Sequence, residues 1–246
     1  MLRRMFFHTP AALQAAIDAC HAAGGGTVYV PPGGYLAAGI LLKTYVALYL
    51  ETGAIIYAST RREDYPQGVR ALIAARKAEH IAILGGGALH GQGGADLRRR
   101  DAPFDPMPEF RPMVIRLEDS TDITLRDFSI FYSDSWACHL NRCQRVVADG
   151  LTIRNNFYRT NSDGIDPDSC QDVRISNCHI SAGDDCICLK TNSGIPCQDV
   201  TVTNCTLESV ATAIKLGTAS DSDFRNIAIS NCTIRNSTVG VGFFVK

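Results

Sequence analysis

VRISNCHI (173–180) returns as VTVTNCTL (200–207) and as IAISNCTI (227–234), so that one unit recurs every 27 residues. Weaker copies precede it at VVADGLTI (146–153) and ITLRDFSI (123–130). Apolar and polar residues alternate in each unit, which is typical of a strand with one buried face. A second short strand is expected in the later repeats, at GIDPD (164–168), CICLK (186–190), AIKLG (213–217) and VGFFV (241–245).

Repeats of this length, with no helical segment between the strands, exclude an alternating strand–helix architecture. They indicate a parallel β-helix, in which each repeat forms one coil. Asn177, Asn204 and Asn231 occupy one place in successive repeats, and their amides are expected to form a hydrogen-bonded ladder at a turn. We therefore expect these asparagines to be structural. The sequence predicts an all-β chain folded as a single β-helix domain over residues 1–246.

The N-terminal third has a different pattern. Thr9 and Pro10 suit a helix N-cap and first helical position, and glycines follow the apolar segment at Gly24. We expect a helix over about residues 10–23 that caps the open end of the coil. Residues 91–113, rich in Arg, Pro and Asp, form either a wall of a cleft or a solvated loop. Early coils are expected at TVYVPPGGY (27–35), VALYLETGAIIYA (46–58) and HIAILGGGALHGQG (80–93). No capping segment follows the last strand, so terminal coils or a C-terminal cap are expected to be missing.

Composition restricts the class of protein. The formal charge is −1 without a basic stripe, so no nucleic-acid partner is expected. No apolar run suits a membrane span, and MLRRMFFHTP (1–10) lacks the apolar core and cleavage site of a signal peptide. Cys178, Cys205 and Cys232 share one repeat position, which favours stacked buried thiols over disulfides. Disulfides stay open for two pairs, Cys138 with Cys143 and Cys186 with Cys188.

Two acidic motifs, NSDGID (161–166) and AGDDC (182–186), lie on neighbouring repeats. The repeat brings Asp163, Asp184 and Asp185 to one surface patch. Like charges raise the cost of ionising one another, so such a cluster indicates a function. Crowding is expected to keep one carboxyl protonated near neutral pH, as a general acid requires.

The spacing of the carboxylates follows from the strand alignment. If Ile165 and Ile187 occupy one buried position, Asp163 and Asp185 both lie two residues before it, on coils stacked at about 4.8 Å. Asp184 is one residue further back, so its side chain is expected to point elsewhere and to leave room for a water molecule. Inverting glycosidases separate acid and base by roughly 6.5–9.5 Å for that purpose. The trio therefore predicts a site that cleaves a glycosidic bond.

These motifs resemble those of glycoside hydrolase family 28, the polygalacturonases and their relatives, which are right-handed, pectin-lyase-like β-helices. NSDGID followed by GDDC is the specific part of the resemblance. It implies an inverting hydrolase of uronic-acid-containing polymers that needs no metal or other cofactor. The resemblance covers nearly the whole chain, through LQAAIDACHAAGGGTVYVPPG (13–33), LYLETGAII (48–56), ILGGGALHGQG (83–93), NSDGIDPDSCQDVRISNC (161–178) and GDDCICLKT (183–191).

The resemblance also implies roles for the aspartates. Asp184 matches the family's general acid, and Asp163 and Asp185 match the pair that holds and deprotonates the attacking water. Asn161 is expected to orient Asp163 or the substrate. His139, on the preceding coil, falls on the strand expected to face the cleft.

Two landmarks of the family are absent. Thr212 stands where the family has the His of a Gly-His-Gly motif. Gly242 and Phe244 stand at the positions of an Arg-x-Lys pair that holds the substrate carboxylate, and Lys246 matches only with a two-residue slip. A uronate polymer needs cationic anchors, so this departure weakens the case for polygalacturonate.

Two lysines are candidates to replace the missing anchors. Lys215 is expected to face outward in line with Asp166, and Lys190 to face outward near it. Each is equally well interpreted as a surface lysine paired with Asp166 or Asp168. We include Asp166, Lys190, Thr212 and Lys215 among the candidate substrate-binding residues. Trp136 is expected either in the core or stacked on a sugar.

Two alternatives stay open. On the same fold, calcium bound by Asp163, Asp185 and their neighbours would support a polysaccharide lyase, with Lys190 or Lys215 as the base. A glycan-binding β-helix with a decayed site is the other. The expected partner is a pectic or related acidic polysaccharide, and a monomer is expected. The resemblance places the chain outside the cell or in the periplasm, although no signal segment is visible.

Overall fold

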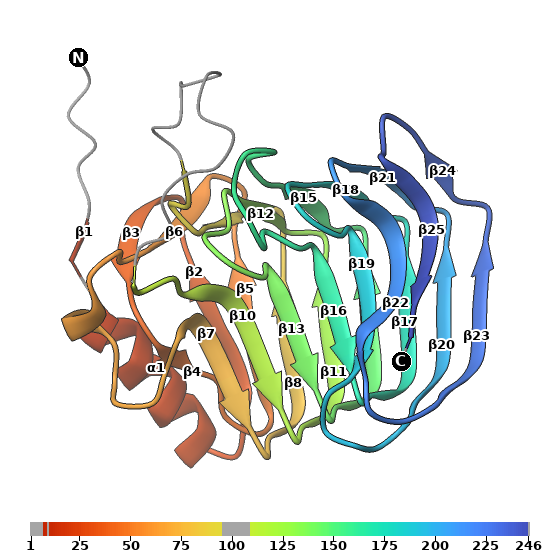
Figure 1. The fold of residues 1–246 in the computed structure, drawn as a ribbon. Coiled ribbons are helices and arrows are strands. Elements are labelled where there is room, and N and C mark those ends of the chain that lie inside the picture. Colours follow the sequence, from red (N-terminus) through yellow and green to blue (C-terminus); the bar gives the residue numbers. More distant parts are fainter. Residues whose placement is uncertain (1–6, 9, 95–108, 246) are drawn as a thin grey trace.

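The computed structural model describes residues 7, 8, 10–94 and 109–245. Their strands form three parallel sheets that run side by side along the molecule (Figure 1). The chain passes from sheet to sheet in a fixed order, and each full coil adds one strand to each sheet in the right-handed sense that parallel strands favour. This is the predicted right-handed parallel β-helix.

The three sheets are named here by their place in Figure 1. The back sheet contains β2 (Gly26–Val30), β5 (Val46–Leu50), β8 (Glu79–Leu84), β11 (Thr121–Arg126), β14 (Gln144–Asp149), β17 (Gln171–Ser176), β20 (Cys197–Thr203) and β23 (Phe224–Ser230). The upper sheet contains β1 (Phe7–His8), β3 (Gly33–Ala37), β6 (Ala54–Ala58), β9 (Ala88–His90), β12 (Ser129–Phe131), β15 (Thr152–Arg154), β18 (His179–Ala182), β21 (Thr206–Ser209) and β24 (Thr233–Ile234). The front sheet contains β4 (Ile40–Leu41), β7 (Ala71–Arg76), β10 (Met113–Glu118), β13 (Cys138–Asn141), β16 (Ile165–Asp168), β19 (Ile187–Thr191), β22 (Thr212–Ser220) and β25 (Val239–Phe244). A short 3-10 helix, Arg62–Asp64, lies between β6 and β7.

Helix α1 (Pro10–Ala22) covers the N-terminal end of the coil, which confirms the predicted capping helix to within one residue. Ile17 is fully buried against the first coil. The side-chain amide of Gln14 makes two hydrogen bonds to the backbone of Leu41 on β4: its Nε2 donates to the carbonyl at 3.1 Å, and its Oε1 accepts from the N–H at 2.8 Å. The proposed N-cap, Thr9, lies outside the described residues. The helix thus hydrogen-bonds backbone groups of the first coil and buries apolar side chains that this coil would otherwise expose.

The eight-residue repeat unit is not one strand, as the alternation predicted, but two. Asn177 separates β17 from β18 with φ of 57°, in the left-handed region that Asn tolerates. Asn204 and Asn231 adopt the same conformation at the same turn. Asn204 Nδ2 donates to Asn177 Oδ1 at 3.4 Å, and Asn177 donates to Asp149 at 2.7 Å. The asparagine ladder is therefore confirmed for Asn177 and Asn204, and it marks the corner between two sheets.

The predicted register of the front sheet is confirmed. Ile165 pairs with Ile187, Ile187 with Ile214, and Ile214 with Val241. The three isoleucines are fully buried, whereas Val241, on the last coil described, is 45% exposed. Full burial of such a side chain contributes roughly 1.5–3 kcal/mol, so these stacked columns hold successive coils in register.

All ten cysteines lie within the described residues, and all are free thiols. Cys178 and Cys205 are buried in one column, as predicted, and Cys232 is half-buried. The two pairs left open by the sequence are also free and buried.

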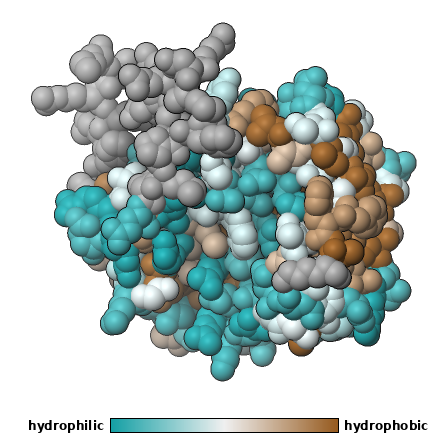
Figure 2. All heavy atoms as spheres, in the orientation of Figure 1, coloured by the Kyte–Doolittle hydropathy of each residue, from teal (hydrophilic) through white to brown (hydrophobic). Residues whose placement is uncertain are grey.

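Apolar side chains are exposed at the C-terminal end of the described coil, where Figure 2 shows a hydrophobic patch. Phe243 is 69% exposed and Val245 56% exposed. β23, β24 and β25 have no further strand beside them among the residues described. Within the same residues, no helix has both the length and the apolarity needed to cross a membrane.

Candidate functional site

The three aspartates of the acidic motifs meet beside the N-terminal ends of β16 and β19, two neighbouring strands of the front sheet. Asp163 stands two residues before Ile165 on β16, and Asp185 two residues before Ile187 on β19. Because those isoleucines pair, the two aspartates lie on neighbouring coils. One carboxylate oxygen from each of Asp163, Asp184 and Asp185 lies within 4.8 Å of the other two. Asp184 therefore joins the cluster. Its offset in the sequence had predicted that its side chain would point elsewhere, and this prediction is wrong.

Two glycines allow the motif loops to approach one another. A Cβ at Gly164 would lie 2.3 Å from the carbonyl oxygen of Cys186, on the next coil. A Cβ at Gly183 would lie 2.3 Å from the carbonyl oxygen of Asn156 and 2.7 Å from that of Arg159. Such separations are far inside ordinary contact, so any side chain there would displace the loops that carry the aspartates.

The aspartates differ in exposure. Asp163 and Asp185 are 3% and 1% exposed, whereas Asp184 is partly exposed at the surface of the cluster. Oδ1 of Asp163 and Oδ1 of Asp185 are buried without a hydrogen-bond partner among the described residues. Buried polar atoms are normally paired, so these two oxygens are available to a ligand that can donate to them.

Burial and crowding raise the proton affinity of the cluster. Desolvation is the largest cause that raises the pKa of Asp163 well above its usual range, and the negative charges of Asp166 and Asp184 raise it further. Desolvation and Asp185 also raise the pKa of Asp184, while Lys215 opposes the rise. Groups coupled this closely share their protons, so the cluster as a whole retains a proton at higher pH than an isolated aspartate would. The direction of these shifts favours a protonated carboxyl in the cluster, and protonation near neutral pH stays a prediction.

Lys215, on β22, binds the cluster directly. Its Nζ lies 2.8 Å from Oδ2 of Asp185, and its side chain is 18% exposed. Burial disfavours the ammonium, but the hydrogen bond and charge of Asp185 raise the pKa of Lys215 overall. Lys215 also lies over the ring of Phe244 at 5.2 Å. The ammonium group of Lys215 is therefore already paired with Asp185, and a substrate carboxylate that bound Lys215 would have to share it with this aspartate.

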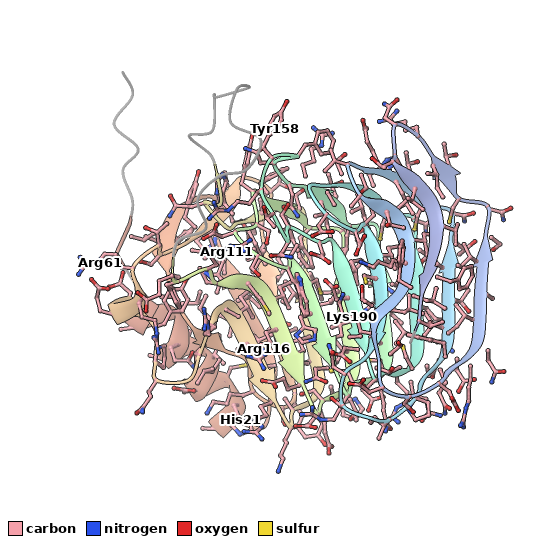
Figure 3. All side chains as sticks on the ribbon, in the orientation of Figure 1. His21, Arg61, Arg111, Arg116, Tyr158 and Lys190 are labelled. Atoms are coloured by element: carbon pink, nitrogen blue, oxygen red, sulfur yellow. The ribbon has the colours of Figure 1, made fainter. Side chains whose placement is uncertain are left out.

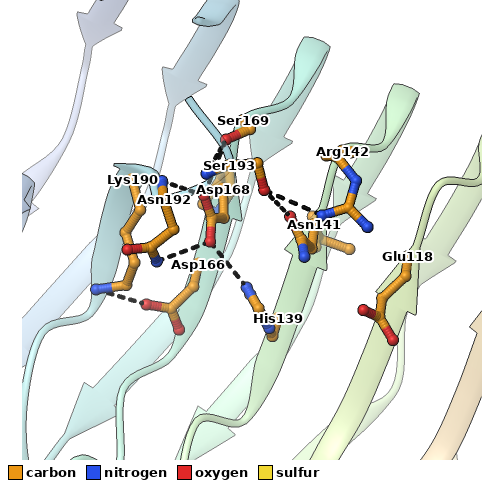
Figure 4. A network of polar contacts seen from close by, with 12 residues as sticks. Glu118, His139, Asn141, Arg142, Asp166, Asp168, Ser169, Lys190, Asn192 and Ser193 are labelled. Atoms are coloured by element: carbon orange, nitrogen blue, oxygen red, sulfur yellow. Dashed lines mark hydrogen bonds and ion pairs between the residues drawn. The ribbon is translucent and has the colours of Figure 1, made fainter. Parts of the chain in front are cut away.

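A buried polar network lies beside the cluster on the same sheet (Figure 4). Lys190 Nζ is 3.4 Å from Oδ1 of Asp166, and Asp166 is fully buried. His139 Nε2 is 3.3 Å from Oδ2 of Asp168, which Asn192 also binds through its backbone and side-chain nitrogens. Desolvation raises the pKa of Asp166 to about 6 despite the opposing charge of Lys190. These side chains point outward from the β-helix, as predicted, but other side chains cover them.

Lys190 pairs with Asp166, as one of the two interpretations of the sequence expected, but it is buried and does not lie at the surface. It is 7% exposed, and Cys188 Sγ lies 2.9 Å from its ammonium group. The ring of Trp136 lies 4.7 Å from Nζ, and the same ring meets His139 edge-on at 4.8 Å. Half-buried Trp136 thus covers Lys190 and His139, which is 6% exposed. Strand alternation predicted the direction of these side chains but not what lies over them.

Asn161 and Thr212 lie at the edges of the cluster. Asn161 is exposed, has φ of 53°, and its Nδ2 donates to Oδ2 of Asp184 at 3.4 Å. It therefore contacts Asp184, where Asp163 or the substrate was expected. Thr212 is buried one coil beyond Asp185, and its carbonyl accepts a bond from the backbone of Cys186 at 3.0 Å.

Arg111, which the sequence analysis did not single out, fixes the loop before Asp163. Its guanidinium donates to the carbonyls of Asp134 and Thr160 and to Oδ1 of Asn161, the last at 3.3 Å. Arg111 belongs to the Arg- and Pro-rich segment 91–113, of which residues 95–108 lie outside the described structure. Its position near the site supports the interpretation of the described end of this segment as part of the site wall.

Two groups of side chains have the composition of a metal site. The first is the trio Asp163, Asp184 and Asp185, whose oxygens suit a hard cation. The second combines Asp163 and Asp166 with Cys188. Lys190 already contacts Asp166 and Cys188, so its ammonium group competes for the second set.

The carboxyl groups of the cluster approach one another closely. One oxygen from each lies within 4.8 Å of the others, whereas the roughly 6.5–9.5 Å typical of inverting glycosidases separates whole carboxyl groups. One water molecule can still bridge two such oxygens, because each O–H···O bond spans about 2.8 Å. The spacing therefore permits a held water but does not support inversion by itself.

Comparison with known proteins identifies the family of this site. The sequence profile of glycosyl hydrolases family 28 matches residues 20–243. The chain belongs to this family. It is 31% identical over 185 residues to a probable polygalacturonase of Vitis vinifera, which covers 68% of this chain and 37% of that protein. The chain thus spans well under two thirds of the length of that relative.

Solved structures share the fold at lower identity. An exopolygalacturonase from Thermotoga maritima superimposes with a TM-score of 0.85 at 20% identity, over 96% of this chain and 65% of the other. A polygalacturonase from Erwinia carotovora ssp. carotovora gives a TM-score of 0.86 at 20% identity, over 98% and 70%. Membership of family 28 confirms the resemblance seen in the two acidic motifs.

Proposed function

We propose that this family 28 chain is a glycoside hydrolase that cleaves glycosidic bonds in pectic or related acidic polysaccharides. The observation that supports it most directly is the meeting of Asp163, Asp184 and Asp185 within 4.8 Å on adjacent coils. The similarity to proteins named polygalacturonases supports the substrate class.

In the proposed mechanism, Asp184 is the general acid. It is the partly exposed member of the trio and has a raised pKa, so it can carry a proton to the glycosidic oxygen of a bound sugar. Protonation of that oxygen lets the C–O bond break as positive charge develops on the sugar. Asn161, bonded to Oδ2 of Asp184, positions the carboxyl.

Asp163 and Asp185 hold the attacking water. Each has a buried oxygen with no hydrogen-bond partner among the described residues, and the two stand one coil apart. Lys215 holds the other oxygen of Asp185 at 2.8 Å, and Asp185 takes the proton from water as the water attacks the anomeric carbon. We propose inversion of configuration from the family resemblance; proton NMR of the first-formed sugar anomer tests it.

The substrate's own charge sets a further requirement. A polyuronate that approaches three aspartates needs nearby cations. Lys215 is the partly exposed cation at the cluster, and we propose that it binds a substrate carboxylate while remaining paired with Asp185. Lys190, Asp166 and His139 then support the floor of the site through the network beneath Trp136, with Thr212 at its edge.

The proposal is tested by incubating the protein with a panel of pectic polymers, with and without a chelator. A hydrolase releases new reducing ends, its products do not absorb in the ultraviolet as unsaturated uronates do, and the chelator leaves the rate unchanged. Ultraviolet-absorbing products that vanish with chelator would replace the hydrolase by a calcium-dependent lyase. Binding without any cleavage would favour a glycan-binding protein.

We further propose that the protein acts outside the cell or in the periplasm, as a monomer, since its polymeric substrate is found there. Eight of its ten free thiols are buried and two are half-buried, which limits their access to oxidants. Fractionation of the cells that produce it, and light scattering of the purified protein, test these two points.

A further inference from the structure

A hollow lies on the front sheet, away from the aspartates. It has a volume of about 270 Å³ and is bordered by three arginines, Arg70, Arg76 and Arg116, with Glu118 as the acidic residue among its lining side chains. Its floor includes Leu41 and Ala74, which are small or apolar. The lining thus carries a net charge of +2, three arginines less one glutamate, in a chain whose total charge is −1.

The hollow shares its side-chain column with the proposed site. Arg116 on β10 pairs with His139 on β13, which pairs with Asp166 on β16. Two coils therefore separate Arg116 from Asp166, or about 10 Å at the usual spacing of strands. Figure 3 shows Arg116 and Lys190 on the same face of the molecule, with the intervening strands between them.

The hollow exists because the coil before Arg116 carries a small residue in the same column. Ala74 on β7 pairs directly with Arg116, and its methyl group leaves the space that a longer side chain would fill. Leu41 lies one further coil along, since it pairs with Ala74. The arginine side chains therefore border an open floor and do not close over it.

The arginines keep hydrogen-bonding capacity. Arg116 donates from Nη2 to Glu118 at 3.0 Å, while its buried Nε has no partner among the described residues. Arg76 contacts Asp119 only at 3.7 Å, because Arg142 already binds both oxygens of that carboxylate at 2.6 and 3.0 Å. Arg70 makes one long bond, 3.5 Å, to the carbonyl of Glu109. A planar guanidinium binds a carboxylate through two parallel bonds, so this is the chemistry that the hollow offers.

We propose that this arginine hollow is a distal subsite that binds a carboxylate of the polyuronate chain whose scissile bond lies at Asp184. The inference rests on the proposed function and adds to it a direction along the front sheet: the substrate extends from the aspartates toward the N-terminal coils. The subsite offsets the repulsion between an anionic polymer and the acidic cluster. Only oligomers long enough to span both places gain from it.

The test is calorimetric binding in the Asp184→Asn protein, which removes turnover, with a series from digalacturonate to hexagalacturonate. Arg116→Gln and Arg76→Gln are expected to weaken binding of the long oligomers about fivefold each, the value of an exposed ion pair, without affecting the shortest. Ala74→Trp, which fills the hollow and keeps all three arginines, is expected to give the same dependence on length. Arg174→Gln is the matched control, because Arg174 is an exposed, ion-paired arginine on the back sheet.

If the subsite binds a carboxylate, a fully methyl-esterified hexagalacturonate should bind equally well to the Asp184→Asn protein with and without Arg116→Gln. The proposal would be overturned if the arginine variants lost affinity equally at every oligomer length, or at none. It would also be overturned if Arg116→Gln weakened binding of the esterified hexamer. Failure of the proposed function would give a different result: the wild-type protein would bind the oligomers with this dependence on length but release no reducing ends. Thermal unfolding of each variant confirms that it is folded before binding is measured.

Discussion

Lys190→Met removes the ammonium group that lies 3.4 Å from Asp166 and keeps most of the aliphatic side chain. Asp166 is fully buried, and neither of its oxygens has a well-directed hydrogen bond among the described residues. The variant therefore leaves one charge buried without compensation. Breaking a buried pair in this way costs about 3–5 kcal/mol, so we expect the free energy of unfolding to fall by roughly 3 kcal/mol near neutral pH.

The pKa of Asp166 gives the loss a pH dependence. Burial raises that pKa from 3.8 to about 6 even with Lys190 present, which corresponds to roughly 3 kcal/mol. Without Lys190 the pKa rises further. A carboxyl whose pKa is higher in the folded state contributes stability at low pH that is lost as pH rises through the folded pKa. The destabilisation is therefore expected to be large at about pH 8 and small at about pH 5, where Asp166 is protonated in the variant.

The assay is urea unfolding followed by circular dichroism at the two pH values. Lys43→Met is the control, because Lys43 pairs with Asp18 at 3.6 Å on the exposed surface and is expected to cost less than about 1 kcal/mol. Asp166→Asn added to Lys190→Met is expected to restore much of the stability lost at the higher pH. An equal loss at both pH values would show that Lys190 acts through packing alone and would refute the reasoning.

Three further predictions concern the site. Gly183→Ala places a Cβ 2.3 Å from the carbonyl oxygen of Asn156, so we expect a loss of about 1–3 kcal/mol in unfolding free energy together with turnover; unchanged activity would contradict the close packing. Because burial and Asp185 raise the pKa of Asp184, the rate should fall at alkaline pH as this acid loses its proton, which a pH–rate profile checks. Lys215→Met removes a charge that lowers the pKa of Asp184, so the alkaline limb should move to higher pH; a shift in the opposite direction would assign the limb to another group.

Much of the fold followed from the repeat, because a fixed interval fixes which residues stack. The pairing of Ile165 with Ile187, and of Ile187 with Ile214, was predictable from the alignment of the second strands. Asn177 was expected at a turn, and two consecutive polar residues, Ser176 and Asn177, interrupt the alternation there. What the pattern did not show is that this turn divides the unit between two sheets, with Asn177 in the left-handed region.

The convergence of the aspartates was predictable for the same reason, but their surroundings were not. Lys190 was expected at the surface, and it is buried because Trp136, from two coils earlier, lies over it. The contact of Arg111 with the loop at Asn161 joins residues 50 positions apart and outside the repeat. Contacts of this kind depend on loops whose lengths differ between coils, and periodicity carries no information about them.

The central claim is that Asp184, held beside Asp163 and Asp185, donates the proton that cleaves the glycosidic bond. The most direct test is the turnover number of Asp184→Asn on polygalacturonate, measured by reducing ends, with Asp172→Asn as a matched control on the back sheet. We predict a loss of at least about a hundredfold for Asp184→Asn, with unchanged thermal stability and no loss in the control. Turnover of Asp184→Asn equal to that of the wild type would contradict the assignment.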